Sequence, residues 1–312
     1  MITTMFTTFI AKPIFNVLTG IYGLLPGHNF GVAIIIFSIV ARMLMWPLLK
    51  KQLHQQKAMR ELQPEIQRIK KETKGDKQAE MARVTQLYKE KEISPFSSLG
   101  LLLVQLPFIF ALISGLRKII NDSHSVITFS YGFIRDFPFM KELANGTAHF
   151  DKTLLGVVDL TRPAIHNLSD WHNIYFPAFV IAILSGLAQY YMSKQLLPSA
   201  TSSGPRKTLR QLMAEQAAGK EVDQSEIMAA QGASMQYFLP VLIFFFTIFY
   251  ASGLALYFLV SSVVGYFQQK TILSQEAVAL DTQTVIDVPA SSVKVTRKTT
   301  SSTSAKSRKK KR

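Results

Sequence analysis

Residues 30–49 read FGVAIIIFSIVARMLMWPLL, and Arg42 is the one charged side chain among these twenty positions. A helix of this length is about 30 Å long, which matches the hydrocarbon thickness of a bilayer. The stretch therefore predicts a membrane-spanning helix that carries an arginine within it.

Three further regions, 96–116, 174–193 and 235–269, are almost purely apolar. The last is too long for one span and has Ala251, Ser252 and Gly253 at its centre, which favour a tight turn. The predicted fold class is an all-α membrane protein with five transmembrane helices. We expect these helices at 27–49, 96–116, 174–194, 235–251 and 252–270.

The segments between the spans have distinct characters. Residues 1–26 alternate apolar runs with polar breaks, which is typical of an interfacial amphipathic helix. Residues 50–95 predict a cytoplasmic hairpin of two helices broken near residues 73–76. Each helix has a narrow apolar stripe, so the pair can close on itself. The stripes comprise Leu62, Ile66 and Ile69, then Met81, Val84, Leu87 and Tyr88. The hairpin is open to two interpretations, a solvated stalk or a docking surface for a partner.

The remaining segments are more polar. Residues 117–173 form a predicted extracytoplasmic loop, and 195–234 a cytoplasmic loop with a helical run over 208–218. Residues 271–312 lose periodicity and fill with Ser, Thr, Lys and Val, so we expect a disordered basic tail there.

Lys and Arg are unevenly distributed between these segments. Residues 50–95 hold 12 and residues from 270 onward hold 10, whereas 117–173 balance 6 basic against 6 acidic side chains. Because basic residues are concentrated in cytoplasmic loops, the N-terminus is predicted outside and the C-terminus in the cytoplasm. Residues 1–11 carry no basic side chain, so no cleavable signal is expected there.

Enzyme chemistry and metal binding find little support in the composition. The chain has no cysteine, which excludes disulfides, zinc thiolates and thiol nucleophiles. Nucleotide-binding loops are missing, and the histidines lie outside the spans at no metal-ligand spacing. These are His28, His54, His124, His149, His166 and His172. We therefore expect no catalytic residue, metal or cofactor.

Arg42 is the strongest candidate for function. A central arginine in a span costs from about 3 to more than 10 kcal/mol and needs water, a partner or an escape route. The other apolar blocks contain no acidic residue but do contain Gln105, Ser185, Gln189, Ser261, Ser262, Gln268 and Gln269. Such groups either line a wet, positively charged recess that attracts an acidic segment, or make ordinary interhelical hydrogen bonds. In the second case Arg42 snorkels or pairs with backbone carbonyls.

Several motifs in this order resemble the YidC/Oxa/Alb family of membrane protein insertases. They are ARMLMWPLLKKQ at 41–52, LQPEIQRIKKE at 62–72, LYKEKEISP at 87–95, LLVQLPFIFALISGLR at 102–117 and YFLPVLIFFFTIFYASGLALYFLVSSVVGYFQQ at 237–269. The resemblance runs along most of residues 10–272. It implies a five-helix core around a hydrophilic groove that is open to the cytoplasm and to lipid.

On that resemblance, Arg42 matches the family's groove arginine, and Gln105 and Gln189 look like polar groove positions. Ser185 is grouped with them, as is Phe258, which stands where relatives commonly carry tryptophan. The basic end of the tail, Arg308, Lys309, Lys310, Lys311 and Arg312, looks similar to tails that help hold ribosomes.

The function that the resemblance implies is insertion and folding of membrane proteins without nucleotide hydrolysis. Implied partners are nascent membrane proteins, membrane lipids, the ribosome and the Sec translocon, and a bacterial plasma membrane is the expected location. The main alternative is a transporter or channel subunit with Arg42 as an anion site, although inverted repeats are not visible. A purely structural scaffold is a further alternative.

Overall fold

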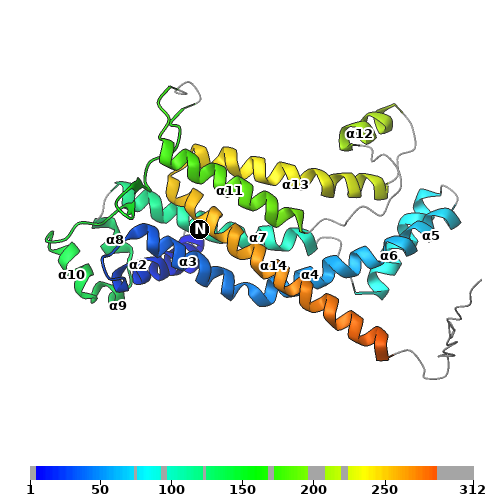
Figure 1. Cartoon of the computed structure of the whole chain (residues 1–312), viewed down its shortest axis with the longest axis horizontal. Helices are drawn as coiled ribbons and strands as arrows, with labels where there is room; N and C mark the ends of the chain where they lie inside the picture. The colour runs from blue at the N-terminus through cyan, green and yellow to red at the C-terminus, as the bar shows by residue number, and fades with distance from the viewer. Residues whose placement is uncertain are drawn as a thin grey trace, which may run out of the picture. The chain divides into compact units, whose positions relative to one another are not determined.

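The computed structural model of this chain describes residues 5–73, 76–92, 97–121, 124–167, 172–195, 208–218 and 224–286. This part is mostly helical, with one two-stranded sheet, in agreement with the all-α prediction. Its elements (Figure 1) are η1 Thr7–Ala11, α2 Lys12–Leu24, α3 Phe30–Leu44, α4 Trp46–Glu61, α5 Gln63–Thr73, α6 Lys77–Glu90, α7 Ser97–Asn121, α8 His124–Phe129, α9 Gly132–Arg135, α10 Pro138–Ala144, β1 Thr153–Leu154, β2 Val158–Asp159, α11 Phe176–Lys194, α12 Leu209–Ala217, α13 Gln224–Ile248 and α14 Ser252–Ile286. Met1–Leu273 forms one compact unit and Ser274–Arg312 a second.

Within the described residues, α11 is by itself long and apolar enough to cross a bilayer. Helix α3 also qualifies when it is joined, across a bend of 54°, to the helical segment Trp46–Thr73. Tyr237–Ile248 of α13 is a shorter apolar helix. The count of five spans therefore stays a prediction.

Large apolar side chains are exposed along α3, α11 and α13. Proteins that are surrounded by water rarely expose contiguous apolar patches of this kind, whereas a helix that faces lipid exposes them without cost. The exposed residues include Val40, Met43 and Leu44, then Leu184, Leu187 and Tyr191, then Phe238, Val241 and Phe245. This surface is the one expected of helices embedded in a bilayer.

Helix α3 has a well-defined start and a sharp end. The Asn29 side chain caps it by accepting a hydrogen bond from the backbone N–H of Val32 (3.1 Å). The helix stops at Leu44, and α4 resumes after Met45 with Pro47 in its first turn. Because proline has no N–H, the carbonyl of Met43 loses its usual helical partner, and this break is where the chain bends.

The helical hairpin predicted for residues 50–95 is present as α5 and α6, with α4 leading into it. The break falls where it was predicted, and the Asp76 side chain caps α6. A salt bridge between Arg83 and Glu72 (3.2 Å) joins the two helices. Leu62 and Ile66 are buried as expected, but Met81 is exposed, so its assignment to the closing stripe is wrong.

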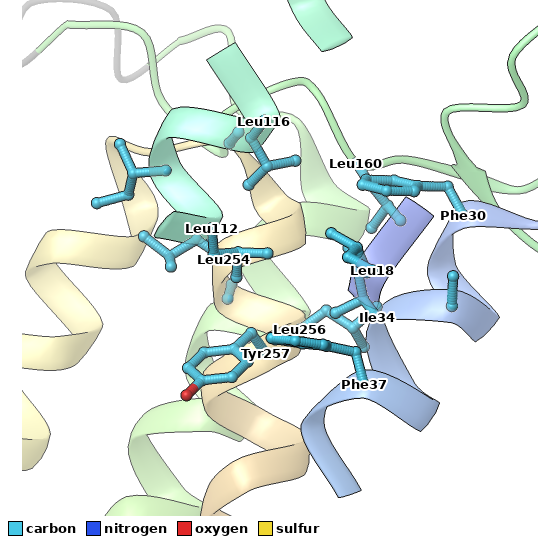
Figure 2. Packing of buried hydrophobic residues seen from close by; sticks show 14 of the residues in the cluster. Leu18, Phe30, Ile34, Phe37, Leu112, Leu116, Leu160, Leu254, Leu256 and Tyr257 are labelled. Carbon is cyan, nitrogen blue, oxygen red and sulfur yellow. The ribbon is translucent and has the colours of Figure 1, made fainter. Parts of the chain in front are cut away.

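The main apolar core joins α2, α3, α7 and α14 (Figure 2). Leu18, Ile34, Leu112 and Leu254 come from these four helices in turn and are fully buried. Helix α2 has one face in this core, which explains its amphipathic sequence. The position of α2 at a membrane interface stays a prediction.

The segment before α11 is joined to the turn between α13 and α14 by backbone hydrogen bonds. Ile165 N–H donates to the carbonyl of Ile248 (2.9 Å), and Gly253 N–H donates to the carbonyl of Leu160 (2.9 Å). The Ser252 hydroxyl adds a bond to the carbonyl of Asp159 (2.8 Å). The helical break predicted here is present, but it lies at 249–251, because Ser252 and Gly253 already belong to the first turn of α14. The backbone bonds hold the segment before α11 against this break.

The prediction of an irregular tail from residue 271 is wrong for its first part, because α14 continues to Ile286. Residues 271–286 contain Leu, Glu, Gln and Ala, which are strong helix formers, and neither glycine nor proline. The rest of the tail lies outside the described residues.

Candidate functional site

Arg42 lies in the last turn of α3, between α11 and α14, and its side chain is only 5% exposed. Its Nη2 reaches the sulfur of Met192 on α11 at 3.9 Å. On α14 the guanidinium rests against Gly265, where an added Cβ would lie 3.1 Å from the Arg42 Cζ and Nη1. We call these three residues the arginine seat.

The arginine seat leaves the guanidinium poorly satisfied. A guanidinium has five N–H donors, and a thioether sulfur is a weak acceptor. In the described structure the Nε of Arg42 has no hydrogen-bond partner, and no ion pair involves its guanidinium. Helices α3 and α11 and residues 252–273 of α14 contain no Asp or Glu. The positive charge is therefore buried without a neutralising carboxylate from these helices.

Neighbouring amides on α14 are also incompletely paired. Gln268 Nε2 donates to the backbone carbonyl of Arg42 at 3.0 Å, just before the α3–α4 break. Its Oε1 has no described partner, and neither do the side-chain oxygen and nitrogen of Gln269. Buried polar atoms without partners are rare in folded proteins and point to water or a ligand. This cluster of unpaired groups next to Arg42 can bind water or an oxygen-rich ligand.

The other predicted groove residues divide into two groups. Gln189 accepts a hydrogen bond from the Ser262 hydroxyl (2.8 Å), which places it against α14 one turn from Gly265. Gln105 donates to the hydroxyl of Tyr257, which lies two turns before Gly265 on α14. These two glutamines are thus tied to the α14 face that holds Arg42.

Ser185 and Phe258 show ordinary packing. The Ser185 hydroxyl donates to the carbonyl of Ala182 in its own helix (2.8 Å), and Phe258 belongs to the apolar core. Nothing in the described structure ties either of them to the guanidinium. Their role in a groove stays a prediction.

All five predicted residues are buried, with exposed fractions between 0% and 9%. The described helices close around Arg42, so the open, hydrated recess expected from the sequence is not seen in this conformation. Helices α3, α11 and α14 would have to separate before a segment of another protein could reach the guanidinium.

The sequence did not single out Met192 or Gly265. A methionine and a glycine do not stand out in an apolar helix. In α14, however, polar and small residues recur with helical periodicity. Ser261, Ser262, Gly265, Gln268 and Gln269 recur at helical spacing and therefore share one face. The predicted ribosome-binding residues, Arg308 to Arg312, lie outside the described residues.

Comparison with known proteins confirms the resemblance. The pattern of the family described as "60Kd inner membrane protein" matches residues 21–278. The protein called membrane protein insertase YidC in Aeromonas salmonicida is 27% identical over 277 residues, which cover 88% of this chain and 38% of that protein. Its namesake in Syntrophobacter fumaroxidans is 29% identical over 262 residues, 84% of this chain and 37% of that protein.

A further YidC insertase, from Tolumonas auensis, is 26% identical over 267 residues, 86% of this chain and 36% of that protein. The chain thus spans less than two fifths of the length of these relatives. The family pattern nevertheless covers well over half of the chain and includes α3, α11 and the apolar part of α14. This chain belongs to the 60Kd inner membrane protein family, the YidC/Oxa/Alb family.

Proposed function

We propose that this protein is a membrane protein insertase that receives acidic segments of its substrates at Arg42. The observation that carries the proposal is the guanidinium itself, 5% exposed and lacking a carboxylate partner in the described structure. Family membership supports the same role.

The electrostatic cost of burying the unpaired Arg42 charge favours binding of a carboxylate from a substrate. An unpaired charge in a medium of low dielectric is costly, and the cost falls when water or an opposite charge reaches it. A carboxylate can bind a guanidinium through two parallel hydrogen bonds, which are stronger than bonds between neutral groups. An acidic substrate segment would therefore stabilise the site and lower its own cost of leaving water.

The driving force for insertion lies in the substrate. Once an acidic segment occupies the arginine seat, the adjoining apolar segment has a shorter path through the bilayer. Burial of its apolar surface in lipid is favourable by itself, so nucleotide hydrolysis is not required. The closed conformation described above is the state between substrates.

We further propose five spans, with the N-terminus outside and the C-terminus in the cytoplasm of a bacterial plasma membrane. The concentration of basic residues in 50–95 and in the tail supports this orientation. Nascent membrane proteins are the proposed substrates, and lipids, the ribosome and the Sec translocon are proposed partners.

The test compares Arg42→Ala and Arg42→Lys in proteoliposomes with substrates that have either acidic or neutral tails. A charge-assisted hydrogen bond is worth roughly 1.5–3 kcal/mol, so Arg42→Ala should weaken capture of acidic tails about tenfold or more. Arg42→Lys should retain part of the activity because it keeps the charge.

Neutral-tailed substrates are the internal control, since they make no ion pair with Arg42. If both substrate types lose insertion equally and the variant unfolds at a lower temperature, Arg42 is a structural residue and the proposal is wrong.

A further inference from the structure

Two large apolar side chains are exposed on the surface in the loop between β1 and β2. The strands pair in antiparallel register, with Thr153 opposite Asp159 and Leu154 opposite Val158, so residues 155–157 form the tip. Leu155 is 72% exposed and Val157 is 75% exposed. No charged residue occurs between Thr153 and Val158. The tip is therefore both apolar and exposed.

The backbone of the tip is held in a conformation that does not suit leucine. Leu155 has φ +52° and Gly156 has φ +73°. Glycine and asparagine adopt such left-handed angles readily, whereas a leucine does so at a cost. Position 155 therefore carries an exposed leucine although glycine or asparagine would adopt this backbone angle at a lower cost.

One side of the β1–β2 hairpin is fixed to the start of α3. Leu154 lies directly on Gly31, where an added Cβ would come 2.7 Å from the Leu154 Cα. The N–H of Leu155 donates to the Asn29 side chain (3.4 Å), which also caps α3. Asn29 in turn donates to the carboxylate of Asp151 (2.9 Å).

The other side is fixed to the start of α11. The N–H of Asp159 donates to the hydroxyl of Tyr175, the residue before that helix, at 2.8 Å. The next residue, Phe176, is 69% exposed. The hairpin thus contacts the first turn of two apolar helices, α3 and α11, and both begin on the same side of the bundle.

We propose that the 155–157 tip is a lipid anchor, with Leu155 and Val157 immersed at the boundary between headgroups and acyl chains of the outer leaflet. The tip lies where α3 and α11 are proposed to enter the bilayer, close to the exposed Phe176 at the start of α11. Such immersion removes two aliphatic side chains from water. This inference rests on the proposed membrane spans.

The native chain has no cysteine, so a single nitroxide label can report the depth of the tip. We would label Val157→Cys in the full chain, reconstituted in vesicles of phosphatidylethanolamine and phosphatidylglycerol. Collision rates with oxygen, which concentrates in lipid, and with a water-soluble nickel chelate give the depth. Val157 is preferred to Leu155 because its backbone carries no left-handed angle.

Two further labels make the result decisive. Leu187→Cys, half exposed in the middle of α11, marks the lipid, and Glu142→Cys, at an exposed position of α10, marks water. The expected ratio of oxygen to nickel collisions at position 157 is several-fold higher than at 142 and approaches the ratio at 187.

A ratio at 157 equal to that at 142, with 187 in lipid, would overturn the lipid anchor alone. A label at 157 that is shielded from both reagents would also overturn it, because a protein or a second copy would then cover the tip. If 187 were also in contact with water, the anchor and the proposed span would fall together.

Discussion

At the residue scale, Arg42 and Gly265 depend on each other. The guanidinium can approach α14 this closely only because position 265 has no side chain, and its Nη2 contacts the sulfur of Met192. This arrangement holds the charge at one depth of the bundle while leaving its Nε unpaired. A ligand that brings oxygen atoms to this point completes the site.

We predict that Gly265→Ala displaces the guanidinium. The new Cβ would lie 2.6 Å from the Met192 sulfur and 3.1 Å from the Arg42 Cζ. Overpacking of this kind typically destabilises a protein by about 1–3 kcal/mol. Insertion of acidic-tailed substrates should fall more than insertion of neutral-tailed ones, as measured in proteoliposomes.

The control for that experiment is Gly186→Ala, whose new Cβ would make its closest contact at an ordinary 3.4 Å, with Phe244. It should behave like the native protein. Adding Met192→Ala to Gly265→Ala should restore part of the insertion, because it makes room for the guanidinium. No difference between the two glycine variants would argue against the arginine seat.

At the element scale, the break between α3 and α4 connects the arginine seat to α4 and the helical hairpin α5–α6. Arg42 lies three residues before Met45, and the carbonyl of Arg42 is held by Gln268 of α14. Beyond the break, Leu49 and Leu53 of α4 pack against Ile272. Movement of α4 relative to α14 would therefore act directly on the position of Arg42.

Pro47→Ala should straighten this break, because alanine restores the N–H that the carbonyl of Met43 lacks. Nitroxide labels at Val40→Cys and Glu61→Cys would measure the change by double electron–electron resonance. In a straight helix their backbones would be about 32 Å apart, so the distance should lengthen towards that value. Pro177→Ala in the first turn of α11 is the matched control and should not alter it.

An unchanged distance in Pro47→Ala would show that packing of α4 on α14 holds the bend, with no contribution from the missing N–H.

At the scale of the whole molecule, sequence periodicity predicted the elements better than their contacts. The apolar run of α11, the turn before α14 and the hairpin break at Asp76 each leave a signal in hydropathy or in helix-stopping residues. The backbone bonds from Leu160 and Ile165 to the α13–α14 turn do not, since any residue can make them. The arginine was predictable because charge in a span is costly, but its glycine and methionine partners were not.

The proposed interaction of the basic tail, residues 287–312, with the ribosome also concerns the whole molecule. Deleting residues 287–312 removes nine Lys and Arg side chains, so the proposed binding to ribosomes should weaken and should depend less steeply on salt. Sedimentation binding over a range of salt concentrations measures both. Replacing Arg308 to Arg312 with glutamine keeps the full length but removes five of the nine charges, so it should have an intermediate effect. Unchanged affinity at low salt would assign the tail to lipid instead.

The central claim is that the site around Arg42 opens to cytoplasmic water during function. Its most direct test is labelling of Ser262→Cys, 1% exposed beside Gln189, by a membrane-impermeant maleimide added from the cytoplasmic side. Ala182→Cys, 0% exposed in the apolar core, is the equally buried control.

Maleimides react with the thiolate, which forms only where water can reach the sulfur. We predict that the cysteine at position 262 is labelled, that an acidic-tailed substrate blocks the reaction, and that the cysteine at 182 stays unmodified. Failure to label position 262 in an active, folded protein would contradict the account.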